Sequence, residues 1–223
     1  MMVQISHAQV VGDQFGRVNL DQSNYKWFRY TSQHFSICYT KENKELAKQL
    51  MNMAELDYVD LSKVFEYRLR KKIELIIFPT FESFDQSNIQ IREPGINEGG
   101  VTRIIKPMIT VHVHNDINNI RGQIRSGIGK ILLGKILAGT NLQELVQNSV
   151  LMNLPDWFLQ GAVAFASDVW DSDYDNQMKD ILYSGRYQNF IEFARDNPTL
   201  AGFSLFHFVH KKYNLKTISN LIY

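Results

Sequence analysis

The chain has 223 residues, of which 44% are hydrophobic and 12% aromatic, which is enough to form a folded core. Its 24 basic and 23 acidic residues leave a formal charge of +1, which gives no support for nucleic-acid binding. No apolar run approaches the roughly 18 residues that indicate a membrane-spanning helix. The single cysteine, Cys38, excludes a disulfide within the chain and is expected to be a buried structural residue.

Residues 1–14 are expected to be either the remnant of a leader or a disordered start. The stretch SHAQ places small residues before a cut between Ala8 and Gln9, as at the end of a signal peptide. This favours an exported, periplasmic protein, and a cytoplasmic protein with a disordered start is the alternative.

The first half of the chain mixes strand and helix patterns. Residues 25–40 alternate as one or two strands, and 42–65 have helical periodicity. The next elements are a strand in 71–80, a short helix at 81–89, a glycine-rich loop at 93–100 and two strands within 100–114 that are joined at Lys106-Pro107.

The second half reads as helix throughout. The expected helices are 118–138, 141–149, 155–167, 174–184, 188–195, 201–212 and a last piece from about 215. Strands with helices followed by helices alone predict an α+β protein with one domain over 15–223.

The helix around RGQIRSGIGKILLGK, residues 121–135, has a core stripe at Ile120, Ile124 and Ile128. It also holds glycines that each cost about 1 kcal/mol relative to alanine. These are Gly122, Gly127, Gly129 and Gly134. Small residues on one face of this helix predict the close approach of a neighbouring helix or strand.

The helix in LPDWFLQGAVAFASD, residues 154–168, is apolar on every side and is therefore expected to be buried. Gln160 is its one long polar side chain. A buried amide needs hydrogen-bond partners. Gln160 is thus expected to face either a polar cleft or a local backbone partner, and the periodicity leaves both open.

The segment LPDWFLQGAVAFASDVWDSDYDNQMKDILYSGRYQNF, residues 154–190, resembles the LPxWFxEGLAEY…WD…MRDAxxxG segment of peptidase MA-like, gluzincin-type zinc peptidase domains. Such domains precede TolB-like β-propellers in bacterial envelope proteins. Residues 25–40, 61–89 and 97–111 resemble earlier segments of that family in the same order, so the resemblance covers roughly 15–221. It implies a zincin-like fold.

In that family a His-Glu-x-x-His helix supplies two zinc ligands and the general base, and the glutamate of WFxEG is the third protein ligand. Placed on this pattern, Ser126 and Lys130 stand where the histidines belong, Gly127 where the base belongs, and Gln160 where the glutamate belongs. Zinc is expected for the family, but these residue types do not hold it. We therefore expect no catalytic residue, no metal ligand and no cofactor at these degenerate positions.

Other histidines offer alternatives. His112 and His114 share one face of a strand, in the hairpin that by resemblance flanks the substrate cleft, so they are candidates for ligand contact together with Lys130 and Gln160. A relocated metal at His112 and His114, or at His207 and His210, is the less favoured interpretation.

Three further motifs do not support a site. DSDYDN, residues 171–176, has Asn176 and Leu182 where a calcium loop needs glycine and glutamate, and it is expected to open a helix instead. EPGINEGG lacks the lysine-serine ending of a phosphate loop. Ser126 lacks the G-x-S-x-G frame of a nucleophile.

The expected function is that of a catalytically inactive binding module of an envelope protein, with a protein or peptide partner that the sequence does not identify. The alternatives are an active hydrolase with a relocated metal and a purely structural assembly domain. We further expect Ser126, Lys130 and Gln160 to lie together around a partly collapsed cleft.

Overall fold

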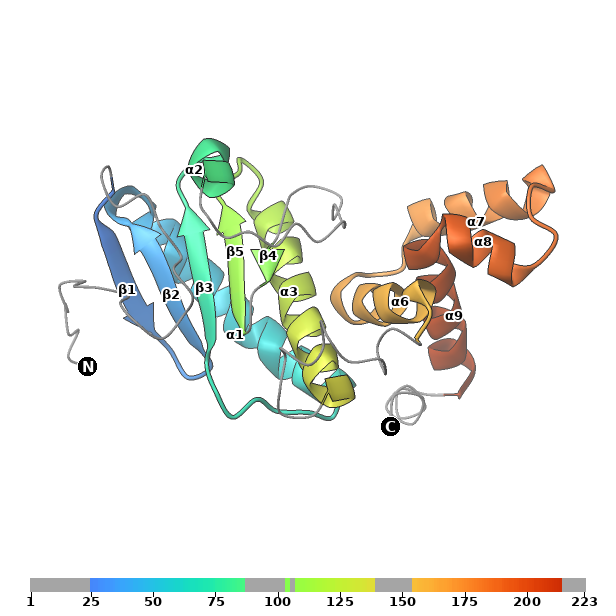
Figure 1. The fold of residues 1–223 in the computed structure, drawn as a ribbon, viewed down its shortest axis with the longest axis horizontal. Helices are drawn as coiled ribbons and strands as arrows, with labels where there is room; N and C mark the ends of the chain where they lie inside the picture. Colours follow the sequence, from blue (N-terminus) through green and yellow to red (C-terminus); the bar gives the residue numbers. More distant parts are fainter. Residues whose placement is uncertain (1–24, 87–102, 105–106, 139–153, 214–223) are drawn as a thin grey trace. The chain divides into compact units, whose positions relative to one another are not determined.

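The structure, a computed structural model, describes residues 25–86, 103–104, 107–138 and 154–213. It is an α+β chain in which a mixed sheet with helices precedes a region of helices (Figure 1). The predicted helix 141–149, the last helix from about 215, the loop 93–100 and the N-terminal 1–14 lie outside the described residues.

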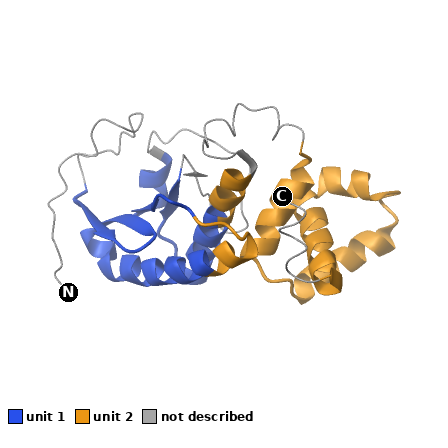
Figure 2. Cartoon of the chain, turned by 90° about the horizontal axis from the view of Figure 1, so that it is seen from below, with its two compact units in different colours: residues 1–59, 69–128 blue, residues 60–68, 129–223 orange. Residues whose placement is uncertain are grey.

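The chain divides into two compact units (Figure 2). Unit 1 comprises residues 1–59 and 69–128, and unit 2 comprises residues 60–68 and 129–223. The single domain over 15–223 stays a prediction.

Unit 1 is built on a five-stranded sheet with the order β1-β2-β3-β5-β4. The strands are β1 (Trp27–Thr31), β2 (Phe35–Thr40), β3 (Ile73–Phe78), β4 (Arg103–Ile104) and β5 (Met108–His112). The three central strands β2, β3 and β5 are parallel, and β1 and β4 pair antiparallel at the edges. The predicted strands within 25–40, 71–80 and 100–114 are confirmed, whereas Lys106 of the predicted Lys106-Pro107 join lies outside the described residues.

One face of this sheet is covered by helix α1 (Lys44–Val64), which passes behind the strands in Figure 1, and by α3 (Ile117–Ala138), whose Gly127 packs on Ile109 of β5. The side chains that this face buries alternate along the strands, as the strand period requires. They are Phe35, Ile37, Leu75, Ile77, Ile109 and Val111. The predicted core stripe of α3 is confirmed, because Ile120, Ile124 and Ile128 are all buried.

The other face carries a smaller core under helix α2 (Phe81–Gln86). Phe78 of β3 and Phe84 of α2 meet edge to face, with ring centroids 5.7 Å apart. Cys38 packs against this core half-buried, and burial raises the pKa of its thiol. This environment fits the structural role expected for Cys38.

A buried carboxylate joins α1 to α3 within unit 1. Asp57 is 1% exposed and accepts two hydrogen bonds from Arg121, at 3.0 and 2.8 Å, and one from Arg125 at 2.9 Å. Charge-assisted pairs of this fork geometry are the stronger kind of hydrogen bond. They fix the relative position of the two helices against the sheet.

In unit 1 the 3-10 turn η1 (Lys41–Asn43) connects β2 to α1. Unit 2 contains the helices α6 (Asp156–Ser167), α7 (Ser172–Ser184), α8 (Phe190–Asp196) and α9 (Pro198–Tyr213). Asp171 caps α7 by accepting from the backbone N–H groups of Asp173 and Tyr174. The prediction that DSDYDN opens a helix is therefore confirmed.

Helix α6 packs along α9 at a crossing of two glycines. A Cβ placed on Gly202 would lie 1.8 Å from the Trp157 carbonyl oxygen, so the two backbones are in direct contact. Only Gly161, Ala162, Val163 and Ala166 of α6 are buried. The prediction that α6 is buried on every side is wrong, because the close glycine contact uses one narrow face and leaves Gln160 exposed. No described helix has the length and apolarity that crossing a membrane requires.

Candidate functional site

The end of β5 places His112 at the edge of the smaller core of unit 1. His112 is 8% exposed, and its ring centroid lies 5.4 Å from that of Phe81, 5.6 Å from that of Phe84 and 6.5 Å from that of His114. His112 shares its strand face with Thr110, and both of these polar side chains are buried.

The His112 ring is buried without a partner for Nδ1 among the described residues. Burial, and then the charge of His114, lowers the pKa of His112, while Glu82 opposes the shift. The ring is therefore neutral near pH 7. A buried polar nitrogen without a partner costs about 1–3 kcal/mol. A ligand group that reached Nδ1 would recover that cost, which makes this end of the sheet a candidate binding site.

The degenerate position Gly127 faces the opposite side of the sheet from His112. A Cβ on Gly127 would lie 2.9 Å from Ile109 Cδ1 and 3.1 Å from Cγ1. Ile109 and His112 have opposite parity on β5, so they point to opposite faces. The structure thus does not bring His112 to Gly127, and the glycine is explained by the close approach of α3 to β5.

Ser126 and Lys130 are one turn apart on α3 and are both half-buried. Between them, Gly129 faces α6 within unit 2, where an added Cβ would lie 3.8 Å from Val163 Cγ1. An added Cβ at Gly127 thus meets the Ile109 side chain closely, whereas one at Gly129 would make an ordinary van der Waals contact with Val163. Ile109 and Val163 belong to different units, so the collapse of the cleft stays a prediction.

Gln160 has a different partner from either alternative of the sequence analysis. It is exposed, and its Oε1 accepts a hydrogen bond from Thr199 Oγ1 of α9 at 2.7 Å. The expectation of a buried amide is wrong, because α6 turns this side chain to its outer face. Ser126 belongs to unit 1 and Gln160 to unit 2, so the meeting of Ser126, Lys130 and Gln160 stays a prediction.

The paired histidines of α9 are held among aromatic rings. His207 stacks on Trp170 with centroids 4.8 Å apart, and His210 lies 5.4 Å from Phe165. Burial, followed by the charges of Lys211 and His210, lowers the pKa of His207. In the part of the chain that the structure describes, no three His, Cys, Asp or Glu side chains are grouped so that they could hold a metal ion.

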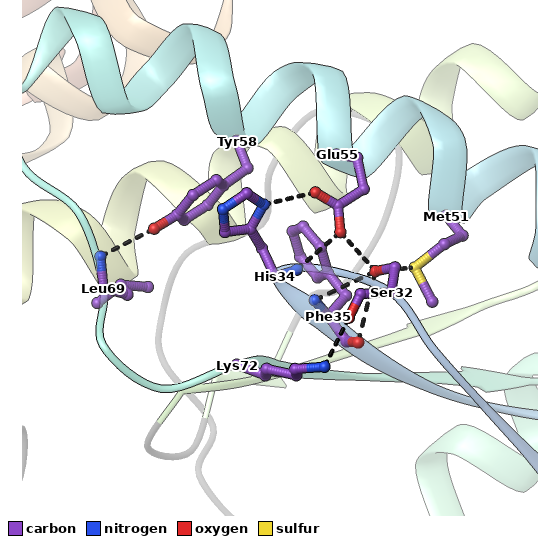
Figure 3. Close-up of polar contacts among 8 residues, drawn as sticks. All are labelled: Ser32, His34, Phe35, Met51, Glu55, Tyr58, Leu69 and Lys72. Carbon is purple, nitrogen blue, oxygen red and sulfur yellow. Dashed lines mark hydrogen bonds and ion pairs between the residues drawn. The ribbon is translucent and has the colours of Figure 1, made fainter.

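A second polar cluster, which no sequence motif predicts, lies where the β1–β2 turn meets α1 (Figure 3). Glu55 accepts a hydrogen bond from the Ser32 hydroxyl, one from the His34 backbone N–H at 2.8 Å and one from His34 Nδ1 at 2.6 Å. The His34 ring stacks on Tyr58 at 4.2 Å. Burial raises the pKa of Glu55, but the bonds from Ser32 and His34 together lower it below its usual value.

This Ser-His-Glu set is not a nucleophilic triad. Ser32 and His34 both bond to the same carboxylate, and within the described residues no hydrogen bond joins the Ser32 hydroxyl to the imidazole. A triad needs that bond, because the imidazole takes the proton of the hydroxyl. The cluster instead tethers the turn to α1. A local sequence pattern cannot predict this cluster, because Glu55 lies 21 residues after His34 in the chain.

Comparisons with protein-family models, with curated proteins and with solved structures find no match for this chain.

Proposed function

We propose that the chain is a catalytically inactive, peptidase-like binding module. The observation that carries the proposal is the contact of Gly127 with Ile109, whose side chain occupies the space next to the position that the resemblance assigns to the general base. A glutamate there would clash with a buried isoleucine and would leave its carboxylate in an apolar environment. The neighbouring ligand positions hold Ser126 and Lys130, which do not bind zinc.

The architecture supports the zincin-like part of the proposal. The resemblance implies that a hairpin borders the sheet and that a helix following it meets the helix of the WFxEG segment. In the structure β4 and β5 form an antiparallel edge, α3 follows them, and a Cβ added at Gly129 of α3 would lie 3.8 Å from Val163 Cγ1 of α6. The helices that would carry the ligands of an active relative thus adjoin in unit 2.

The proposed ligand contact is the end of β5. His112 Nδ1 is the buried polar atom without a described partner there, and Phe81, which is 47% exposed, stands over the ring. A neutral imidazole beside an exposed aromatic ring suits a peptide, whose backbone offers both donors and acceptors and whose side chains pack on the aromatic ring. Within this proposal the partner is a protein or peptide of the cell envelope, and the chain is exported.

The experiment that tests the inactive assignment uses protein purified without an affinity tag. We expect no stoichiometric zinc by metal analysis and no cleavage of internally quenched peptides, with or without added Zn²⁺. Stoichiometric zinc that is lost on His112→Ala, together with peptide cleavage, would establish the relocated metal site and refute the proposal.

Binding is tested separately with a random peptide library displayed on phage. We expect the wild type to enrich peptides that His112→Ala does not retain, while His207→Ala, a histidine in unit 2, retains them. Equal enrichment by the wild type and His112→Ala would remove the end of β5 from the binding site.

A further inference from the structure

The connection between α1 and β3 carries three consecutive cations. Arg70, Lys71 and Lys72 are all exposed, and Arg68 precedes them in the chain. In the described parts of the chain, no contact pairs Arg70 or Lys71 with an acidic side chain. The charge of the whole chain is only +1, so this is a local concentration of positive charge.

This connection is held at both ends by hydrogen bonds (Figure 3). The Leu69 backbone N–H donates to the Tyr58 hydroxyl at 2.8 Å, and Lys72 Nζ donates to the Ser32 carbonyl at 2.6 Å. The first backbone N–H of β3 donates to the His34 carbonyl at 2.8 Å. Arg70 and Lys71 therefore project from a backbone that is already ordered, which reduces the entropy lost on binding.

Two acidic side chains of the neighbouring elements already have partners, and Glu66 is an exposed acidic residue of the connection itself. Glu55 accepts the bonds from Ser32 and His34, and Glu74 of β3 lies 3.6 Å from Arg29. Glu66 offsets one of the four cations at Arg68, Arg70, Lys71 and Lys72, so the connection keeps a net positive charge. An anion from outside is the group that the exposed cations are free to bind.

We propose that Arg70, Lys71 and Lys72 form a docking surface for the phosphate headgroups of an anionic membrane. The backbone bends at Arg70 and Lys71, so the three residues span less than the roughly 10 Å of an extended chain, and their long side chains can reach two or three neighbouring phosphates. A nucleic-acid binding protein that makes about 6–10 phosphate contacts uses more cations than the three of this surface. A protein interface needs an apolar centre, whereas Leu69, the apolar residue next to the cations, is half-buried. The inference uses only contacts of unit 1 and does not depend on the proposed function.

The test is cosedimentation of the full chain with vesicles of equal phosphatidylglycerol and phosphatidylcholine, compared with phosphatidylcholine alone. Each basic residue near an anionic surface contributes about 1 kcal/mol, so Arg70→Gln combined with Lys71→Gln should weaken binding about 30-fold. The control combines Lys41→Gln with Lys44→Gln, which removes the same charge from exposed lysines beyond the opposite end of β2. The control should bind like the wild type, and molar salt should abolish binding.

Several results would overturn the proposal. These are no wild-type binding to anionic vesicles, an equal loss in the control variant, or full competition by soluble glycerol phosphate at the same phosphate concentration, which would assign the site to a free anion. Preferential binding of RNA over vesicles would assign it to nucleic acid. Circular dichroism of both double variants checks that folding is unchanged, as expected for exposed side chains.

Discussion

The crossing of α6 and α9 makes a sharp prediction about two glycines. A Cβ added to Gly202 would lie 1.8 Å from the Trp157 carbonyl oxygen and 2.6 Å from the Cα of Gly161. A Cβ added to Gly161 would lie 2.3 Å from the carbonyl carbon and the Cα of Gly202. The obstructing atoms are backbone on both helices, so no side-chain rotation relieves either contact.

The magnitude follows from the distance that the helices must move. Carbon–oxygen contacts are normally about 3.3 Å or longer, so alanine at Gly202 requires a shift of about 1.5 Å. A gap of about 1 Å already forfeits about half of the dispersion energy between packed atoms. Overpacking costs about 1–3 kcal/mol, and the backbone clash places this case at the upper end. Alanine returns about 1 kcal/mol of helix propensity, which leaves a net loss of about 2 kcal/mol.

The assay is urea unfolding followed by tryptophan fluorescence, because Trp157 and Trp170 lie in unit 2 with the crossing and Trp27 lies in unit 1 with the control position. Gly122→Ala is the matched control. Gly122 is an exposed glycine of helix α3 with nothing within 4 Å of an added Cβ. The Gly122→Ala variant should gain about 0.5–1 kcal/mol in the free energy of unfolding, so glycine to alanine is expected to stabilise the protein at Gly122 and to destabilise it at Gly202.

Two outcomes would refute the reasoning. One is a Gly202→Ala variant that is as stable as the wild type, and the other is a Gly122→Ala variant that loses as much stability as Gly202→Ala. The double variant Gly161→Ala with Gly202→Ala provides a further check. Its loss should be smaller than the sum of the two single losses, because one separation of the helices relieves both clashes.

Three other substitutions test separate contacts. Glu55→Gln should lose about 1 kcal/mol near neutral pH, a value reduced for partial exposure. Hydrogen bonding lowers the folded pKa of Glu55 below 4.5, so the stability that Glu55 contributes is present above the unfolded pKa and is lost as the pH falls through the folded pKa. The melting temperature of the variant should therefore fall less on acidification than that of the wild type, and an equal fall would contradict this. Asp57→Asn should lower the free energy of unfolding in urea by about 3 kcal/mol, because Arg121 and Arg125 then face a neutral amide in a buried position. A loss near zero would show that the ion pairs of Asp57 do not stabilise the fold. His112→Phe should gain about 1 kcal/mol in calorimetric melting by removing an unpaired buried nitrogen, while losing the peptides selected by the wild type; a destabilised variant would show that Nδ1 has a partner.

The elements with long regular periodicity were the predictable part of this fold. The expected helix 118–138 corresponds to α3 (Ile117–Ala138), and its isoleucine stripe is buried as the period of 3.6 residues requires. The order of strands within the sheet was not predictable, because pairing of β2 with β3 and of β3 with β5 depends on contacts distant in sequence. The exposure of Gln160 was mispredicted, because composition alone does not show that α6 buries only the face that carries Gly161.

The candidate site was predictable in its residue types and much less in its geometry. Alternation correctly placed Thr110 and His112 on one strand face, but which face is buried depends on α2, which supplies Phe81 and Phe84. Gly127 was singled out by its cost to the helix. Its partner, Ile109, could not be found from the sequence, because the strand contacts α3 only after both pack on one core.

The state of Cys38 has a practical consequence for labelling. It is the single cysteine of the chain, it is half-buried against the smaller core, and its raised pKa keeps the thiolate scarce at neutral pH. Maleimide reagents act through the thiolate, so they should modify the native protein slowly. An exposed cysteine introduced on α7, at Lys179 for example, would react first. Spectroscopic probes can therefore be attached at chosen positions without replacing the native residue.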